Sequence, residues 1–189
     1  MSRWEPNARE RLAQAALDLY AERGFEQTTV AEIAKRAGLT ERTFFRHFAD
    51  KREVLFSGGT ELQERMVNGV VDAPAQAAPM EAVAAGLAAG GGVLEERRAF
   101  AHKRAGVIAA SAELQERELI KLSGMATALA DALRRRGVAE PAASLTAQAG
   151  IAVFRVAFAR WVEEGNVLAL PDVIQESLDE LRAVTAASR

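Results

Sequence analysis

The sequence has no cysteine, one tyrosine and two histidines among its 189 residues. Without cysteine, the chain forms no disulfide, has no thiolate nucleophile and offers no cysteine ligand for zinc. A cysteine-free chain suits a reducing compartment, so we expect it in the cytoplasm. The N-terminal MSRWEPNARE has no apolar core typical of a secretory signal, and Arg, Glu or Gly interrupts each apolar stretch before the ~20 residues that span a bilayer. We therefore expect no membrane partner.

Neither positive nor negative charge is in large excess in this sequence. The formal net charge is −2, from 24 Lys and Arg against 26 Asp and Glu. Residues 1–56 carry ten basic and nine acidic side chains, so neither part of the chain is strongly basic. Bulk charge therefore gives no argument for nucleic-acid binding, which must be judged from the positions of the charges.

Strand-like alternation is absent, because apolar residues recur at three- and four-residue spacing along the chain. This pattern predicts an all-α protein with helices at 8–23, 30–37, 41–48, 51–71, 80–89, 94–110, 113–136, 142–164 and 171–186. The stretch DAPAQAAP at 72–79 is typical of a connector, and Gly90-Gly91-Gly92 is expected to interrupt a helix. We expect an N-terminal domain at 1–56 and a second helical domain at 57–189.

Helix caps mark the N-terminal segment. A cap residue followed three positions later by glutamate occurs at Asn7–Glu10, Thr29–Glu32 and Asp50–Glu53. In each pair the cap side chain accepts from a free helix amide while the carboxylate reaches back to the cap. Three such pairs around short segments predict three closely spaced helix starts.

The stretch TVAEIAKRAGLTERTFFRHF, residues 29–48, has the pattern of a helix-turn-helix. Its first helix carries small Ala34 on the packed face, which permits a close crossing. Gly38 supplies the positive φ of a sharp turn. Thr40 is placed to cap the second helix, and Phe44 and Phe48 are spaced to pack against the first.

The remaining side chains of the second helix carry the predicted chemistry. Arg42 and Thr43 lie in its first turn, where a recognition helix meets base edges; Arg pairs with guanine, and Thr bonds a base or contacts a thymine methyl. Arg46, Lys51 and Arg52 suit phosphate contacts. The alternative is a helical hairpin with a solvated charged face.

Residues 9–56, and above all the run from Thr40 to Lys51, resemble the DNA-binding domain of the tetracycline-repressor (TetR) family. The matching positions are Gly24-Phe25, Thr28-Thr29-Val30, Ile33-Ala34, Ala37-Gly38, His47-Phe48 and Lys51. The resemblance implies a regulator that binds operator DNA. Together with the motif it gives the predicted DNA-binding set: Thr29, Thr40, Arg42, Thr43, Phe45, Arg46, His47 and Lys51.

Two residues of this set, Phe45 and His47, are open to more than one interpretation, and so is Arg3 near the N-terminus. The family often has tyrosine, with a phosphate-binding hydroxyl, where this chain has Phe45, so one backbone contact is in doubt. His47 is either a phosphate contact or a histidine packed at the edge of the core. Arg3 belongs either to an arm in the minor groove or to a disordered terminus.

Pairing of two copies is expected, because a two-fold operator needs two recognition helices about one DNA turn apart. Apolar stripes run along the last two helices, and the resemblance implies that these helices form an intermolecular four-helix bundle. The alternative is that both stripes pack within one monomer. The predicted interface residues are Ile151, Val162, Ile174, Leu178 and Leu181.

A small-molecule effector pocket is the second feature that the resemblance implies, in the region after the connector. The candidate lining residues are Phe100, His102, Arg104, Val107, Met125, Phe154, Phe158 and Trp161, with His102 and Arg104 as polar anchors. The alternative is ordinary core packing, for which aromatic residues and methionine at helical spacing are typical. The Ala and Gly residues of this region leave room for a ligand or allow close helix packing.

An enzyme is the main competing class. The sequence offers no nucleophile–base set and no phosphate loop, and the position three residues before His102, where a di-metal bundle needs Glu, is Ala99. We therefore predict no catalysis, no metal and no cofactor. A protein-interaction module is a further alternative, supported by the nearly neutral N-terminal domain and by Phe45. The favoured prediction is a homodimeric repressor on a palindromic operator, released by a small-molecule inducer.

Overall fold

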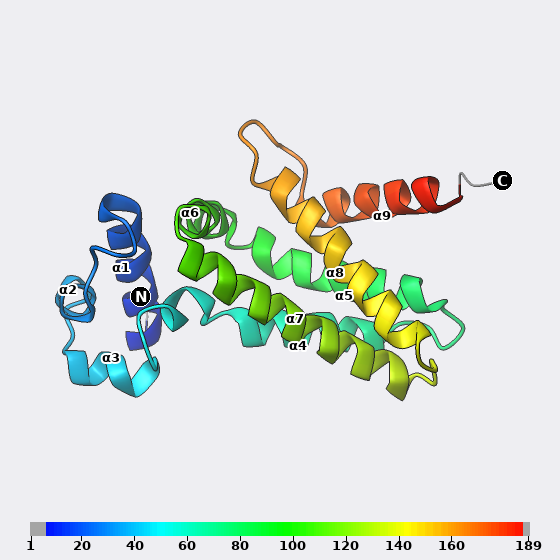
Figure 1. Ribbon diagram of the computed structural model, residues 1–189, viewed down its shortest axis with the longest axis horizontal. Coiled ribbons are helices and arrows are strands. Elements are labelled where there is room, and N and C mark those ends of the chain that lie inside the picture. Colours follow the sequence, from blue (N-terminus) through cyan, green and yellow to red (C-terminus); the bar gives the residue numbers. More distant parts are fainter. Residues whose placement is uncertain (1–6, 187–189) are drawn as a thin grey trace, which may run out of the picture. The chain divides into compact units, whose positions relative to one another are not determined.

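The computed structural model describes residues 7–186, so the predicted minor-groove arm at Arg3 lies outside the described residues. Every regular element within this range is helical, and no strand occurs in it, which confirms the all-α prediction. The elements labelled in Figure 1 are α1 (Ala8–Arg23), α2 (Val30–Arg36), α3 (Glu41–His47), α4 (Gly59–Val71), α5 (Pro79–Glu95), α6 (Arg98–Ala109), α7 (Ala112–Arg135), α8 (Ala142–Trp161) and α9 (Leu170–Ala186), with a 3₁₀ turn, η1 (Glu53–Phe56), before α4.

Two compact units make up the chain. The first runs to Gly58 and also takes in His102–Leu119, the end of α6 and the start of α7. The second comprises Gly59–Ala101 and the chain from Ile120 onward. We expected one boundary after residue 56; the first unit instead recruits a distant segment, because ion pairs and hydrogen bonds join it to α1 and η1.

The first unit is built on α1, which contacts α2, α3 and η1. Its centre is a set of fully buried apolar side chains that includes Leu12, Leu17, Ile33, Phe44 and Val54. Helices α2 and α3 have seven residues each, too few to be stable alone in water. Packing on α1 and well-made caps must therefore hold them.

The cap side chain of each predicted pair accepts as expected, and the reciprocal carboxylate bond is seen at Thr29–Glu32. Asn7 Oδ1 accepts from the amide of Glu10 at 3.0 Å, and Thr29 and Glu32 form a reciprocal capping box. Asp50 Oδ1 accepts from the amides of Arg52 (2.8 Å) and Glu53 (3.1 Å). The turn that it begins is the short η1 rather than an α-helix.

The predicted continuous helix at 51–71 is wrong. Residues Glu53–Phe56 form η1, and α4 begins only at Gly59. The break falls at Ser57-Gly58-Gly59, whose glycines have low helix propensity. Arg9 donates to the carbonyl of Ser57 at 3.3 Å, which ties the break to α1.

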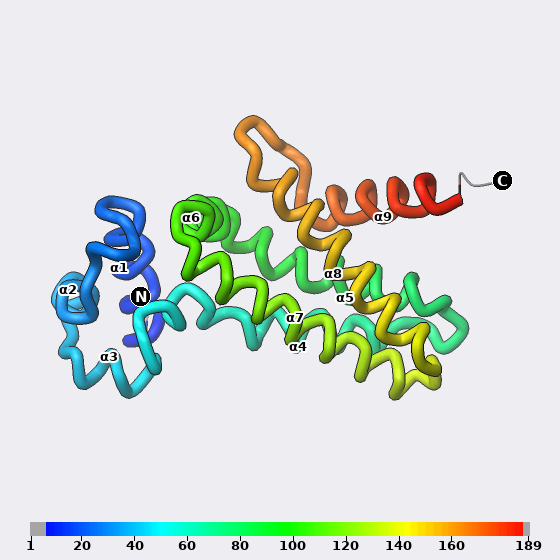
Figure 2. Tube along the Cα trace, in the orientation of Figure 1, coloured from blue at the N-terminus to red at the C-terminus, as the bar shows by residue number. Residues whose placement is uncertain are grey.

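In the second unit, α5 contacts α4, α8 and α9, and α8 also contacts α9 (Figures 1 and 2). Its core includes Val83 and Leu87 from α5, Leu129 from α7, and Phe154 and Trp161 from α8. Figure 2 shows that the chain passes from α8 to α9 through a long turn. Helices α4 to α9 all contribute to this apolar interior, as expected for a helical domain.

The glycines of α5 do not interrupt it, contrary to our prediction. A Cβ on Gly90 would lie 2.6 Å from a side-chain carbon of Met66, and one on Gly91 would lie 3.0 Å from Ile174. At Gly86 the obstacle is backbone, because a Cβ would lie 2.5 Å from the carbonyl oxygen of Met66. These glycines let α4 and α9 approach α5, so the close-packing alternative describes them.

Helix α8 is long and apolar enough to span a membrane by length and composition alone. We expected no such stretch. The core helix of a soluble protein satisfies the same test, and one side of α8 is buried through Ala147, Ile151, Phe154 and Trp161. The feature is weak evidence for a membrane, but it leaves the other side of α8 to be explained.

Candidate nucleic-acid interface

The turn between α2 and α3 is closed by a side chain from α1. Gly38 has φ of +66°, in the left-handed region that favours glycine. Arg11 donates from its guanidinium to the carbonyl of Ala37 at 2.5 Å, and a Cβ at position 38 would lie 2.9 Å from that nitrogen. Arg11 therefore positions the turn. Nothing local in the sequence marks it, because its partner lies 26 positions away.

Helix α3 has a buried side and an exposed side, as the helix-turn-helix pattern predicts. Phe44 and Phe48 are buried against the rest of the first unit. On the other side, Arg42, Phe45 and Arg46 are exposed. The side chains needed for a DNA-reading surface therefore lie free on the first unit.

Within the described part of the first unit, unpaired positive charge lies on α2 and α3. Among its described residues, the basic side chains without an ion pair or hydrogen bond are Lys35 on α2 and Arg42 and Arg46 on α3. The other Lys and Arg residues of the unit are held by carboxylates or backbone carbonyls: Arg9, Arg11, Arg23, Arg36, Lys51, Arg52, Lys103, Arg104 and Arg117. Lys35 was missed in the sequence, although its place on the outer side of α2 was a signal.

The hydroxyl groups of the three predicted threonines take part in helix caps. Thr29 accepts from the amide of Glu32 and donates to the Glu32 carboxylate. Thr40 accepts from the amide of Thr43 at 3.2 Å, and the two hydroxyls lie 3.1 Å apart. The Thr43 hydroxyl is thus tied to the cap of α3, while its methyl group is left for an apolar contact.

Lys51 is placed differently from what a phosphate contact requires. Its ammonium donates to the carbonyls of Phe25 (2.9 Å) and Thr28 (3.1 Å), with that of Glu26 at 3.4 Å, and lies 4.3 Å from the centre of the Phe25 ring. The Tyr20 hydroxyl donates to the Lys51 carbonyl at 2.7 Å, and burial raises the pKa of that hydroxyl. Lys51 therefore braces the turn after α1, and its contact with a phosphate stays a prediction.

Arg52 is likewise engaged within the protein. Its guanidinium donates to Asp50 at 2.6 Å and pairs with Glu113 at 3.2 Å, so the phosphate role predicted for it is not supported. The hydrogen bond from Arg52 is the largest cause that lowers the pKa of Asp50. For His47, Nε2 is buried without a hydrogen-bond partner among the described residues, which favours the packed alternative.

The α6–α7 segment (His102–Leu119) is joined to α1 and η1 by several polar contacts. Lys103 pairs with Asp18 of α1 at 2.5 Å, and Arg117 pairs with Glu53 of η1 at 2.5 Å. Arg104 donates to the carbonyl of Leu55 at 2.7 Å.

Arg104 is the most enclosed of these cations. It also pairs with Glu118 at 3.1 Å and lies 4.8 Å from the ring centre of Phe56. Burial lowers the pKa of its guanidinium, and Glu118 opposes that effect. Arg104 thus has internal partners within the first unit, and its role as a ligand anchor stays a prediction.

The other residues predicted to line an effector pocket fall in both units. His102 and Val107 belong to the first unit, where Val107 is buried and His102 is half-buried. The remaining residues belong to the second: Phe100, Met125, Phe154, Phe158 and Trp161.

Within the second unit three aromatic rings form a row. The ring centres of Phe154 and Phe158 lie 6.1 Å apart, and those of Phe158 and Trp161 lie 5.6 Å apart. Trp161 donates from its indole nitrogen to Glu95 at 3.0 Å, and Glu95 also accepts from the amide of Leu170 at 2.9 Å. The row is packed in the core, and Glu95 fastens it to the start of α9.

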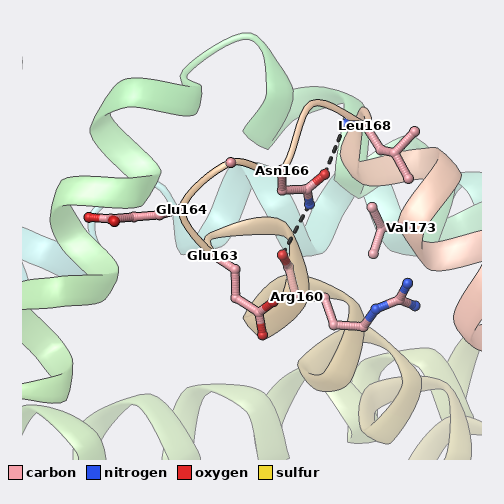
Figure 3. A pocket seen from close by; sticks show the side chains of 7 residues that line it. Arg160, Glu163, Glu164, Asn166, Leu168 and Val173 are labelled. Carbon is pink, nitrogen blue, oxygen red and sulfur yellow. Dashed lines mark hydrogen bonds between the residues drawn. The ribbon is translucent and has the colours of Figure 1, made fainter.

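An open depression lies at the turn between α8 and α9 (Figure 3). It is shaped by Asn166, which donates to the carbonyl of Arg160 at 3.0 Å and accepts from the amide of Leu168 at 2.9 Å. The other lining residues are Glu163, Glu164, Gly165 and Val173. None of the predicted pocket residues lines it, and its shallow polar walls do not resemble a site for an apolar ligand.

The predicted dimer residues are largely part of the chain's own core. Ile151, Ile174 and Leu178 are buried, while Val162 and Leu181 are partly buried against the same core. The apolar side of α9 therefore packs within one copy, as the alternative had it. Two of the large exposed apolar side chains lie on the opposite side of α8.

This opposite side, the α8 outer face, consists of Leu145, Ala152, Val156 and Ala159, all exposed. Spacings of seven, four and three residues place them along one side of the helix. Leu145 is 66% exposed and Val156 is 56% exposed. The apolar stripe predicted for this helix follows its buried side, and the outer face was not predicted.

Family comparisons match both parts of the chain. Residues 12–57 match the tetR family of bacterial regulatory proteins, and residues 77–186 match the MftR C-terminal domain. The chain is 37% identical over 75 residues to the HTH-type transcriptional regulator TcmR of Streptomyces glaucescens. That alignment covers 40% of this chain and 33% of TcmR, and one to the uncharacterized regulator YerO of Bacillus subtilis covers 17% of YerO. The chain thus spans a third or less of these curated relatives.

Solved structures share the whole fold. SmeT in complex with triclosan superposes with a TM-score of 0.68 at 22% identity, over 95% of this chain and 91% of SmeT. SmeT is the repressor of a multidrug efflux pump of Stenotrophomonas maltophilia. FadR of Bacillus subtilis in complex with stearoyl-CoA gives a TM-score of 0.65 at 21% identity, over 91% and 96% of the two chains. At these identities the likeness concerns the fold alone.

Proposed function

Because this chain belongs to the TetR family of bacterial transcriptional regulators, we propose that it is a repressor that binds a palindromic operator as a homodimer. Regulators of this family bind DNA and are not enzymes. A cytoplasmic location follows from that role. In our proposal a small-molecule inducer releases the dimer from its operator.

The observation that carries the proposal is the distribution of unpaired charge in the first unit. Its other described Lys and Arg side chains are satisfied internally, whereas Lys35, Arg42 and Arg46 are left without partners. Arg42 lies in the first turn of α3 and suits a guanine edge. Lys35 and Arg46 suit phosphates on either side of it. A nearly neutral domain can therefore bind DNA through one locally basic surface.

Dimerisation is proposed through the α8 outer face rather than through the residues predicted from sequence. Leu145 and Val156 are exposed on a helix whose other side is fully used by the core. Burial of such a face against a second copy removes apolar area from water, which is the main favourable contribution to obligate dimers. A two-fold axis beside α8 would give the DNA two recognition helices.

For the effector, we propose a site in the second unit near the row of Phe154, Phe158 and Trp161. Two proteins of similar fold are solved with triclosan and with stearoyl-CoA, both with large apolar parts. The packed row implies that a ligand must displace side chains to enter. An inducer then acts by binding better to a conformation that fits the operator worse.

Helix α6 is the proposed connection between effector and DNA. It begins in the second unit, where Arg98 donates to Glu95 and to the carbonyl of Asn166. It ends in the first unit, where Arg104 holds the carbonyl of Leu55. The other stretch of chain that joins the two units is interrupted between η1 and α4.

The test of the proposed function is selection of bound duplexes from fragmented genomic DNA, followed by binding at several salt concentrations. A palindromic consensus is expected. With Lys35 and Arg46 of two protomers at phosphates, log K should fall against log salt with a slope of about −4. Recovery of no enriched sequence, or binding that does not respond to salt, would contradict the proposal and favour a protein-interaction module.

A further inference from the structure

Phe45 is the only exposed aromatic side chain among residues 7–186. It is 56% exposed, on a helix side that otherwise carries charge. Its ring meets the buried Phe44 ring edge to face, with centres 5.4 Å apart and planes at 81°. Contact with a fixed ring limits the orientations that Phe45 adopts, so it is presented to solvent in a defined position.

The neighbours of Phe45 identify the kind of surface it faces. Arg42 lies three residues before it and Arg46 directly after it, and neither has a partner among the described residues. The two unpaired guanidinium groups suit the negative charges of a polyanion, and the exposed ring between them suits an apolar group on the same ligand. In the major groove, that group is the C5 methyl of thymine. A phenyl ring carries no donor for a phosphate oxygen, so backbone hydrogen bonding does not explain its exposure.

Building on the proposed function, we propose that Phe45 determines specificity by packing against the C5 methyl group of one thymine in each half-site. The contact selects thymine over cytosine at that position, since cytosine lacks the methyl group. Arg42 and Phe45 then read adjacent base pairs by different chemistry, one by hydrogen bonding and the other by apolar contact. The operator should therefore carry an invariant thymine in each half-site.

Deoxyuridine provides the direct test, because it differs from thymidine only by this methyl group. Duplexes selected by the protein from random-sequence DNA are synthesised with deoxyuridine at one thymine position at a time, symmetrically in both half-sites. Loss of a buried methyl group should weaken wild-type binding about fourfold per half-site, or about fifteenfold for the dimer. Phe45→Ala should bind the thymine and uracil duplexes equally.

Two variants make the result specific to Phe45. Phe45→Tyr keeps the ring and should keep the preference for thymine, and Val71→Ala, which truncates an exposed apolar side chain at the end of α4, should leave the preference unchanged. Equal binding of wild type to every uracil-substituted duplex would overturn the proposal, as would an undiminished preference in Phe45→Ala. Failure of wild type to bind the unmodified duplex would instead contradict the proposed function.

Discussion

The two compact units specify their structures by different means. In the first, polar side chains bind backbone: Thr29 and Asp50 cap helices, Arg11 closes the α2–α3 turn, and Lys51 holds carbonyls after α1. In the second, glycines and alanines set close helix crossings around a large apolar core. The caps can be predicted from the sequence, whereas the long-range bonds of Arg11 and Lys51 and the helix packing of the second unit cannot.

This difference determines how function is recognised in each unit. In the first, most charges are accounted for by structure, so the few that remain identify the binding surface. In the second, the informative residues are apolar ones that the core leaves out, such as Leu145 and Val156. The following substitutions test this contrast, from the largest expected effect to the smallest.

Val156→Glu should have the largest effect, because it places a charge in the centre of the proposed dimer surface. Burial of an unpaired carboxylate costs several kcal/mol, so the dimer should dissociate while each copy remains folded. Sedimentation equilibrium should give a monomer with wild-type helix content. DNA affinity should fall by about two orders of magnitude or more, since one half-site remains.

Val71→Glu is the matched control. Val71 is also an exposed valine, but it lies at the end of α4 rather than on the α8 outer face. It should leave a dimer with unchanged operator affinity. A Val156→Glu protein that stays dimeric would contradict the α8 outer face as the interface.

Gly86→Ala should destabilise the second unit by about 3 kcal/mol, an overpacking cost at the upper end of the usual range. The added Cβ would lie 2.5 Å from the backbone oxygen of Met66, which cannot move aside as a flexible side chain would. Gly92→Ala meets nothing within 4 Å and should stabilise α5 by about 0.5–1 kcal/mol. Urea denaturation of both variants measures the difference, and equal effects would contradict the close-packing explanation.

These glycines also show the limit of prediction from sequence. The bounds of α1 and the starts of α2 and α3 follow from caps and from Gly38. By contrast, Gly90–Gly92 reads locally as a helix break, because the side chains that occupy the space beside it come from residues 66 and 174. Likewise, periodicity shows which residues share a side of α8 but not whether the core or a second copy covers that side.

The same limit applies to the DNA-binding surface. Exposure of Arg42 and Arg46 could be predicted from the buried spacing of Phe44 and Phe48. Pairing of Arg52 and the bonds of Lys51 could not, because their partners include Glu113 and the carbonyls of residues 25–28. A basic residue beside a recognition helix is thus available to DNA only if the fold leaves it unpaired.

Arg42→Ala should cost about 2 kcal/mol on the selected operator and relax the preference at one base position. Arg46→Ala should weaken selected and random duplexes alike, and should make the salt slope less negative by about 1 per protomer. Fluorescence anisotropy with both duplexes at several salt concentrations separates these roles. Identical ratios of specific to random binding in the two variants would reverse the assignment.

Lys51→Met should destabilise the first unit by about 1 kcal/mol, because the carbonyls of Phe25 and Thr28 lose their donor. Thermal unfolding measures this loss. Operator binding well below the transition, with a wild-type salt slope, should be nearly retained. If the variant had unchanged stability and a less negative salt slope, the result would instead support the phosphate contact that the sequence predicted for Lys51.

Asp50→Asn should show the smallest effect, and the pH dependence identifies its cause. The hydrogen bond from Arg52, followed by the amides of Glu53 and Arg52, holds the pKa of Asp50 below its ordinary value of 3.8. Since the folded-state pKa lies below the unfolded one, the carboxylate stabilises the fold above that ordinary value and loses this contribution as pH falls through the folded pKa. The side chain is 37% exposed, so water screens the pair and about 0.5 kcal/mol is expected. Urea denaturation at about pH 6 should therefore give a lower free energy of unfolding for Asp50→Asn than for wild type. This gap in unfolding free energy should close at about pH 3 or below. A gap that is constant across this range would mean that cap geometry, rather than charge, is what Asp50 contributes to η1.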